Sequence, residues 1–197
     1  MKNILQIILI TFFTFAISSC AKKEESTTAG AAAPAPAIST FNGTFNGTCA
    51  GANSKTDVMV ITDTTATEGE IVYSDSGCST KVWGNSYNYS VVSTVIATVD
   101  GKSVSKIEGT TTTSSRTLYT DAYVTNANEG SWCGKSDWVK NTAQNVTGLT
   151  CSSLSETYPA AGVKKYDIWH LTGNTFLHSG FSSDGYATSL DYTKTKE

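Results

Sequence analysis

Short runs of alternating apolar and polar residues, separated by turn residues, fill the chain from Phe41 to Glu197. Alternation with a period of two residues is typical of strands with one buried face. The 197 residues include 31 Thr and 24 Ser, side chains that suit strands and compete with helical hydrogen bonds. We therefore expect an all-β fold, an antiparallel up-and-down meander of about 8–10 strands closed into a β-barrel. A β-sandwich is the alternative.

Turn residues divide this region into the strands that we expect. Asp-Gly and Gly-Asn pairs between alternating runs indicate hairpins, because glycine adopts positive φ angles without steric cost. No stretch with helical periodicity is long enough to connect two parallel strands. The expected strands are Phe41–Cys49, Lys55–Asp63, Glu70–Asp75, Tyr87–Val99, Ser103–Thr112, Thr117–Asn126, Asp137–Val146, Lys165–Leu171, Phe176–Gly180 and Tyr186–Tyr192.

The longest of these runs, Tyr87–Val99, allows its buried face to be assigned. Its odd positions carry tyrosine, valine and alanine, whereas its even positions carry mostly Asn, Ser and Thr, so the odd face is the buried one. A two-residue turn at Asp100-Gly101 pairs Val95 with Lys106 and brings that charge to the buried face. A three-residue loop with a bulge at Gly101 avoids this, and we expect the bulged loop.

The N-terminus resembles a bacterial lipoprotein signal. Lys2 precedes the apolar run Ile4–Ile17, which suits a secretory signal and is shorter than the ~20 residues needed to span a bilayer. The run ends in Ile17-Ser18-Ser19-Cys20, which is similar to a lipobox. This resemblance implies cleavage before Cys20 and lipid attachment to its sulfur, with residues 1–19 as the signal peptide.

A spacer and a folded domain follow the predicted lipid site. Residues 20–40 contain no aromatic residue and two of the three prolines, a composition that predicts a disordered linker. Residues 41–197 then form the barrel domain. The predicted partner is a membrane of the cell envelope, reached through the N-terminal lipid. Ala21, next to the modified cysteine, favours the outer membrane, at its periplasmic or surface face.

The four remaining cysteines predict two disulfide bonds. They are Cys49, Cys78, Cys133 and Cys151, and four cysteines in an exported domain can pair in three ways. We favour Cys49–Cys78 with Cys133–Cys151, because each bond then closes a local loop. No C-x-x-C motif is present, which argues against a metal or redox role.

Composition and motifs argue against several functions. A net charge of −3 leaves no basic footprint for nucleic acid. No G-x-S-x-G motif occurs, and a two-residue turn at Gly173-Asn174 places His170 and His178 on opposite faces of one hairpin. We therefore expect a protein that is not an enzyme and has no cofactor and no metal. The oligomeric state stays open.

Aromatic residues are numerous and have two interpretations. They can fill the core, or some can line a cavity, since an eight-stranded barrel has room for one small ligand. Tyrosine hydroxyls are costly to bury without a partner, so a polar cavity mouth suits them. We predict a ligand pocket lined by Tyr87, Tyr89, Trp169 and Phe176.

Three segments together resemble the lipocalin family. Gly43-Thr44-Phe45 is similar to the Gly-x-Trp motif of the first lipocalin strand, and Thr120-Asp121-Ala122-Tyr123 to the mid-chain Thr-Asp-Tyr motif. The hairpin from Tyr166 to Phe176, followed by Asp184-Gly185, looks like the closing strands of lipocalin-like bacterial lipoproteins. The resemblance implies a barrel that binds a small hydrophobic molecule and carries no catalytic residues. The alternative function is a structural or adhesive envelope lipoprotein with a filled barrel.

Overall fold

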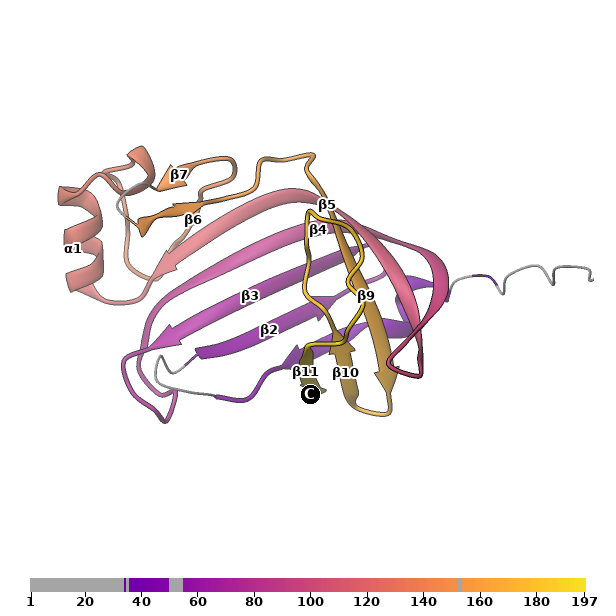
Figure 1. Ribbon diagram of the computed structural model, residues 1–197. Helices are drawn as coiled ribbons and strands as arrows, with labels where there is room; N and C mark the ends of the chain where they lie inside the picture. Colours follow the sequence, from indigo (N-terminus) through magenta and orange to yellow (C-terminus); the bar gives the residue numbers. More distant parts are fainter. Residues whose placement is uncertain (1–33, 35, 50–54, 152–153) are drawn as a thin grey trace, which may run out of the picture. The chain divides into compact units, whose positions relative to one another are not determined.

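A computed structural model of the chain describes residues 34, 36–49, 55–151 and 154–197 (Figure 1). They belong to one compact unit, Ala32–Glu197. The predicted signal peptide 1–19 and the predicted lipid site Cys20 lie outside the described residues. Within the described part of the chain, no helix combines the length and the apolar composition that crossing a membrane requires.

Eight antiparallel strands close into a β-barrel, as the alternation pattern predicts. The order around the barrel is β4-β3-β2-β1-β11-β10-β9-β5, and β4 also pairs with β5 to close it. The barrel strands are β1 (Gly43–Asn46), β2 (Lys55–Ile61), β3 (Thr65–Tyr73), β4 (Lys81–Val99), β5 (Lys102–Leu118), β9 (Lys164–Thr172), β10 (Thr175–His178) and β11 (Tyr192–Lys196). The all-β closed barrel is therefore confirmed, and the sandwich alternative is wrong.

The chain between β5 and β9 leaves the barrel and forms what we call the insert, residues 119–163. It contains α1 (Asp121–Glu129), the 3-10 helix η2 (Trp132–Gly134), β6 (Ala143–Asn145), β7 (Thr150–Cys151) and β8 (Glu156–Thr157). In Figure 1 the insert lies beside the ends of the long strands β4 and β5. Buried residues give it a core that it shares with the end of β5: Leu118, Ala127, Cys133, Trp138, Val146, Cys151 and Tyr158.

The predicted strand Thr117–Asn126 is wrong, because this segment holds α1. Thr, Val and Tyr favour strands, but the Thr120 hydroxyl accepts a hydrogen bond from the backbone N–H of Tyr123 and so caps a helix. Ala127 is fully buried against the rest of the insert. Local capping and tertiary packing therefore override strand propensity here.

Two further predicted strands are also wrong. Of Asp137–Val146, only Ala143–Asn145 forms a strand, and the side chain of Asn128 instead holds both backbone groups of Trp138. Tyr186–Tyr192 is irregular apart from its last residue, and the barrel is closed by β11 just beyond it. The alternating lysines and threonines of β11 do not have the apolar face that a strand prediction requires.

The β4–β5 hairpin differs from the predicted register. Val99 pairs with Lys102 across a two-residue turn in which Asp100 and Gly101 have φ angles of 51° and 71°. The predicted three-residue loop is therefore wrong. A bulge between Ser93 and Val95 shifts the register by one residue, so that the buried Ile107 pairs with Ser93.

The predicted buried face of β4 is correct only for the residues before this bulge. Tyr89 and Val91 are 4% and 3% exposed, which confirms that the odd face of β4 points inward before the bulge. Beyond the bulge Val95 is 46% exposed, so its predicted burial is wrong.

The hairpin between β9 and β10 matches the prediction. Thr172 pairs with Thr175 across Gly173-Asn174, and His178 pairs with Trp169. Both disulfide bonds are also those that the sequence favours. Cys49–Cys78 joins the segments after β1 and after β3, and Cys133–Cys151 joins η2 to β7 inside the insert.

The barrel core includes residues that precede the predicted domain boundary. A 3-10 helix, η1 (Ile38–Phe41), packs Ile38 and Phe41 into the same buried cluster as the strand residues. The fold therefore starts before residue 41, and the end of the predicted linker is ordered. The buried members of this core are Ile38, Phe41, Phe45, Met59, Ile61, Ala66, Tyr89, Val91, Ile107, Trp169 and Phe176.

Candidate functional site

A cavity of about 810 Å³ opens where the barrel meets the insert. Strands β2, β3, β4, β5, β10 and β11 form its barrel wall, and the insert contributes the rest. The lining residues are Asp57, Glu68, Gly69, Glu70, Trp83, Asn85, Tyr87, Arg116, Tyr123, Trp132, Leu154, Glu156, His178, Tyr192 and Lys194. We call the part near His178 and Lys194 the barrel end, and the part near Arg116 and Trp132 the insert end.

A buried carboxylate and imidazole lie at the barrel end. Asp167 and His178 are 0% and 1% exposed, and Oδ2 of Asp167 lies 3.2 Å from Nδ1 of His178. The carboxylate accepts four more hydrogen bonds, from the backbone N–H groups of Ile168 and Ser179, the Ser179 hydroxyl and the Trp169 indole. Asp167 is thus held as a fully partnered anion.

The remaining nitrogen of the imidazole, Nε2, has no hydrogen-bond partner in the part of the chain that the structure describes. Nδ1 of His178 lies 3.2 Å from Asp167 and 3.1 Å from the backbone nitrogen of Gly180. Nδ1 thus lies between the Asp167 carboxylate, an acceptor, and the Gly180 backbone N–H, a donor. Nε2 is buried and makes no hydrogen bond with any described residue, and His178 lines the cavity.

Lys194 is the second buried group at the barrel end without a close partner. It is 3% exposed, and among the described residues it has neither a hydrogen bond nor an ion pair within 4 Å. Burial lowers the pKa of the Lys194 ammonium, while Asp57, Glu68 and Asp167 raise it from a longer distance. An ammonium buried in this way is costly unless a ligand or water completes its hydrogen bonds.

Glu68 faces the same space from β3. Loss of hydration raises the pKa of its carboxyl to about 7, while the nearby His178 and Lys194 oppose this rise. Asp167 and Asp57 add to it, since like charges disfavour ionisation. Near neutral pH, Glu68 can therefore both donate and accept a hydrogen bond.

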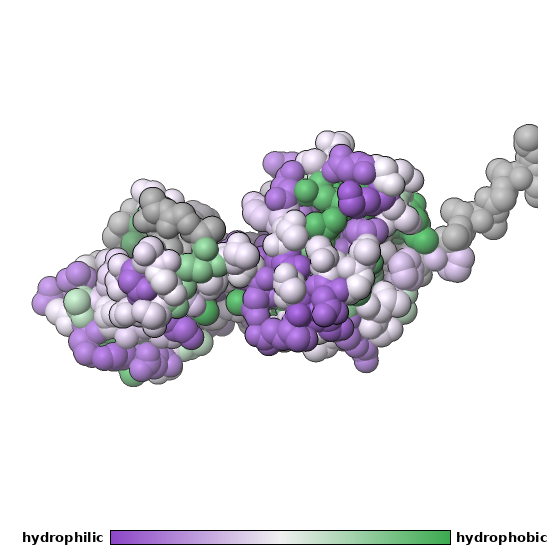
Figure 2. All heavy atoms as spheres, turned by 90° about the horizontal axis from the view of Figure 1, so that it is seen from below, coloured by the Kyte–Doolittle hydropathy of each residue, from purple (hydrophilic) through white to green (hydrophobic). Residues whose placement is uncertain are grey.

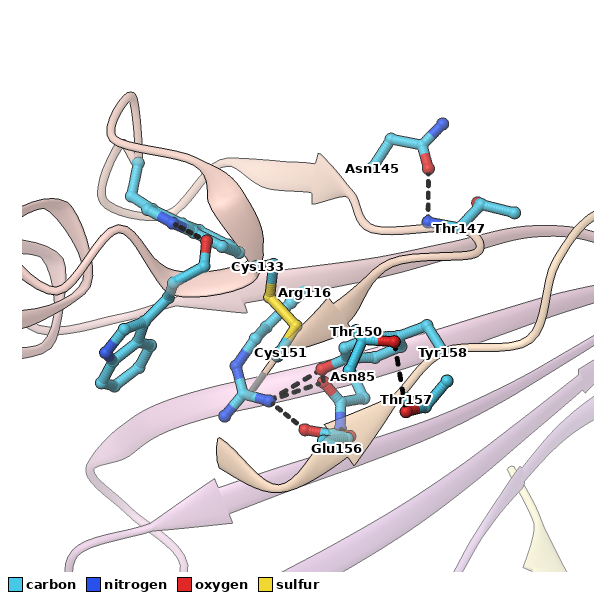
Figure 3. The surroundings of a disulfide bond; sticks show 12 residues. Asn85, Arg116, Cys133, Asn145, Thr147, Thr150, Cys151, Glu156, Thr157 and Tyr158 are labelled. Carbon is cyan, nitrogen blue, oxygen red and sulfur yellow. Dashed lines mark hydrogen bonds and ion pairs between the residues drawn. A yellow bond between two sulfur atoms is a disulfide. The ribbon is translucent and has the colours of Figure 1, made fainter. Parts of the chain in front are cut away.

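At the insert end, the polar groups satisfy one another. Figure 3 shows Asn85, Glu156 and Tyr158 around the guanidinium of Arg116, near the Cys133–Cys151 disulfide. Nη1 of Arg116 lies 2.7 Å from Glu156 and 2.8 Å from the Tyr158 hydroxyl, which itself donates to Asn85 at 2.9 Å. Nε of Arg116 has no hydrogen bond with any described residue, but the guanidinium lies 4.3 Å from the centre of the Trp83 ring.

Aromatic rings line the insert end around this network. Tyr123 and Trp132 meet edge to face at 6.1 Å, and Tyr87 stacks on Tyr158 at 6.1 Å. Loss of hydration raises the pKa of Tyr158 to about 12, so its hydroxyl keeps its proton and remains a donor. The insert end therefore combines apolar surface with polar groups that, apart from Nε of Arg116, have hydrogen-bond partners among the described residues.

The structure separates the four residues predicted to line a pocket. Tyr87 lies on the cavity wall, whereas Tyr89, Trp169 and Phe176 belong to the barrel core. Tyr89 packs on Phe181 at 4.1 Å, and Trp169 and Phe176 are fully buried. The prediction that the three core side chains line this cavity is wrong, because the barrel interior below the cavity is filled.

Sequence reasoning did not identify Glu68, Asp167 or Lys194. The burial of Asp167 could have been predicted, because strand alternation places it on the same inward face of its strand as Trp169. His170 and His178 lie on opposite faces of the hairpin, as predicted. His178 points inward, whereas His170 contacts the Ser103 carbonyl and the Thr172 hydroxyl.

The surface and the comparisons add little to this description. On the face seen in Figure 2, hydrophobic residues form small separate groups among hydrophilic ones. No family model and no curated protein matches the chain. The cavity is therefore the feature of the structure that bears on function.

Proposed function

We propose that this protein is a lipid-anchored lipoprotein of the cell envelope, of lipocalin-like type, that binds a small amphiphilic molecule in its cavity. The polar head of the ligand lies at the barrel end, and its apolar body lies against the aromatic rings of the insert end. The sequence Ile17-Ser18-Ser19-Cys20 supports the anchor, and the closed eight-stranded barrel is consistent with the lipocalin resemblance.

The observation that carries the proposal is the difference between the two ends of the cavity. At the insert end Arg116, Asn85 and Glu156 bond to one another. At the barrel end, Nε2 of His178 is buried without a hydrogen-bond partner among the described residues. Lys194 is 3% exposed and has no hydrogen bond or ion pair with any of them. Buried polar groups in folded proteins are normally paired, so unpaired groups facing a cavity indicate a ligand site.

The amphiphilic ligand proposed for this cavity differs from the hydrophobic ligand expected from the sequence. Asp57, Glu68 and Lys194 on the cavity wall make it too polar for a molecule without a polar group. A molecule with one polar head and an apolar body fits both ends.

The protein isolated from its own envelope tests the proposal. Gentle detergent extraction of the full-length protein, followed by native mass spectrometry, is expected to show a co-purifying small molecule. Lys194→Met is expected to lose this molecule, whereas Lys102→Met, at the exposed β4–β5 turn, is expected to retain it. Wild-type protein that carries no small molecule and binds none of the probes below favours the structural or adhesive alternative.

A further inference from the structure

We infer that the head group of the ligand is a carboxylate, bound by the Lys194 ammonium with Glu68 and His178 beside it. This inference depends on the proposed function, because it names the ligand class of the same cavity. The groups that decide it line one cavity from three strands of the barrel wall, β3, β10 and β11.

Lys194 supplies the first argument. Its ammonium carries three N–H donors, and no described residue offers an acceptor within hydrogen-bond distance. Asp57 and Glu68 act on it only from a longer distance. A buried cation with unused donors binds an anionic acceptor best, because charge and hydrogen bond are then satisfied together.

Glu68 and His178 supply the second argument. A protonated Glu68 carboxyl can donate a hydrogen bond to a ligand carboxylate, as can Nε2 of His178 when it carries a proton. Asp167 holds the other side of the ring, since its Oδ2 lies 3.2 Å from Nδ1. All three groups can therefore become donors around one bound anion.

Other acidic and phenolic groups also surround the site. Asp57 from β2 and Glu70 from β3 line the same wall, Asp167 lies behind His178, and Tyr192 follows from β11. Glu70 already has an interaction, and Asp167 is fully hydrogen-bonded. Asp57 and Glu70 are thus the acidic side chains on this wall that oppose an anion, and Lys194 lies close enough to Asp57 to be affected by its charge.

A cationic or neutral head group fits less well. A ligand ammonium is repelled by Lys194 and leaves its donors unused. A hydroxyl offers Lys194 an acceptor but no countercharge. A carboxylate supplies both, and its apolar body can extend toward Trp132 and Leu154.

Three probes with one body and different heads test the inference: 2-naphthoic acid, 2-naphthalenemethanol and 2-naphthylmethylamine. Isothermal titration calorimetry on the full chain at pH 6 is expected to show the acid binding at least tenfold more tightly than the other two. Lys194→Met is expected to remove this preference, with a much larger loss of affinity for the acid than for the alcohol, whereas Lys102→Met retains it.

A pH series adds a second measurement. Raising the pH from 6 to 8 deprotonates Glu68 beside the ligand carboxylate, so acid binding is expected to weaken severalfold. Glu68→Gln keeps an uncharged donor at all pH values and is expected to remove most of this dependence.

The outcomes separate this inference from the proposed function. If the alcohol or the amine binds as tightly as the acid, or if Lys194→Met keeps the acid preference, the carboxylate assignment is wrong and the cavity is still a binding site. If none of the three probes binds at millimolar concentration and no molecule co-purifies, both proposals are overturned.

Discussion

The imidazole of His178 lies 3.2 Å from the carboxylate of Asp167, and neither side chain is more than 1% exposed. The ring also stacks on Phe176 at 5.2 Å, with Tyr192 at 5.3 Å. Its orientation is therefore determined by one charge and two aromatic rings. This arrangement keeps Nε2 at the cavity and links the stability of the barrel core to the chemistry of the site.

Asp167→Asn tests this link. An amide cannot replace a carboxylate that accepts from the Trp169 indole, the Ser179 hydroxyl, two backbone N–H groups and His178. Breaking such a buried polar network is expected to cost about 3 kcal/mol or more in the free energy of unfolding. Urea denaturation measures it, with the exposed Asp184→Asn as control. A loss no larger than in the control contradicts this role.

Lys194→Met is expected to stabilise the unliganded protein, by about 1–2 kcal/mol, because it removes a buried ammonium without close partners. The melting temperature of ligand-free protein checks this. In the variant, 2-naphthoate should no longer raise the melting temperature. Destabilisation would show instead that Lys194 maintains the positions of Asp57 and Glu68 structurally.

Glu68 is expected to make stability depend on pH. Its folded-state pKa of about 7 lies above the usual glutamate value of 4.5, so the folded state holds this proton more tightly. The contribution is complete below pH 4.5 and is lost as the pH rises through 7, with an upper limit of about 3 kcal/mol.

Glu68→Gln has no such proton to lose. We expect the variant to match the wild type near pH 5 and to be more stable at pH 8, as measured by urea denaturation at both values. The exposed Glu129→Gln serves as control. If the stability difference between the wild type and Glu68→Gln stays the same from pH 5 to pH 8, Glu68 is not a half-buried group that holds its proton near neutral pH.

Replacing Cys133 and Cys151 by serine is expected to loosen the insert while the barrel stays folded. The bond closes a loop with a sequence separation of 18, for which loop-closure entropy is about 3 kcal/mol. Hydrogen exchange should accelerate in residues 119–163, and naphthoate binding should weaken because Tyr123 and Trp132 line the cavity. Replacing Cys49 and Cys78 is the matched control and should leave exchange in the insert unchanged.

Cys20→Ala is expected to release the protein from the membrane fraction, because lipid attachment at that sulfur is the predicted anchor. Detergent phase partitioning and mass spectrometry of the mature N-terminus check this. An unmodified N-terminus at another position in the wild type would overturn the anchor.

Local sequence patterns predicted those features of the fold whose interactions lie close together in the sequence. Gly173-Asn174 determines its own turn, and the turn determines the pairing of His178 with Trp169. The two disulfides close local loops, and alternating residues predicted the closed barrel. In each case the physical cause lies within a few residues or within one strand pair.

Tertiary structure decided the features whose causes lie far apart in the sequence. Thr120 begins a helix because the insert has its own core, and the β4 bulge removes Val95 from the buried face. The cavity joins Glu68, His178 and Lys194 from three strands, and barrel closure alone brings them together. The cost of burying Lys194 depends on which charges surround it in three dimensions, and strand alternation carries no information about those neighbours.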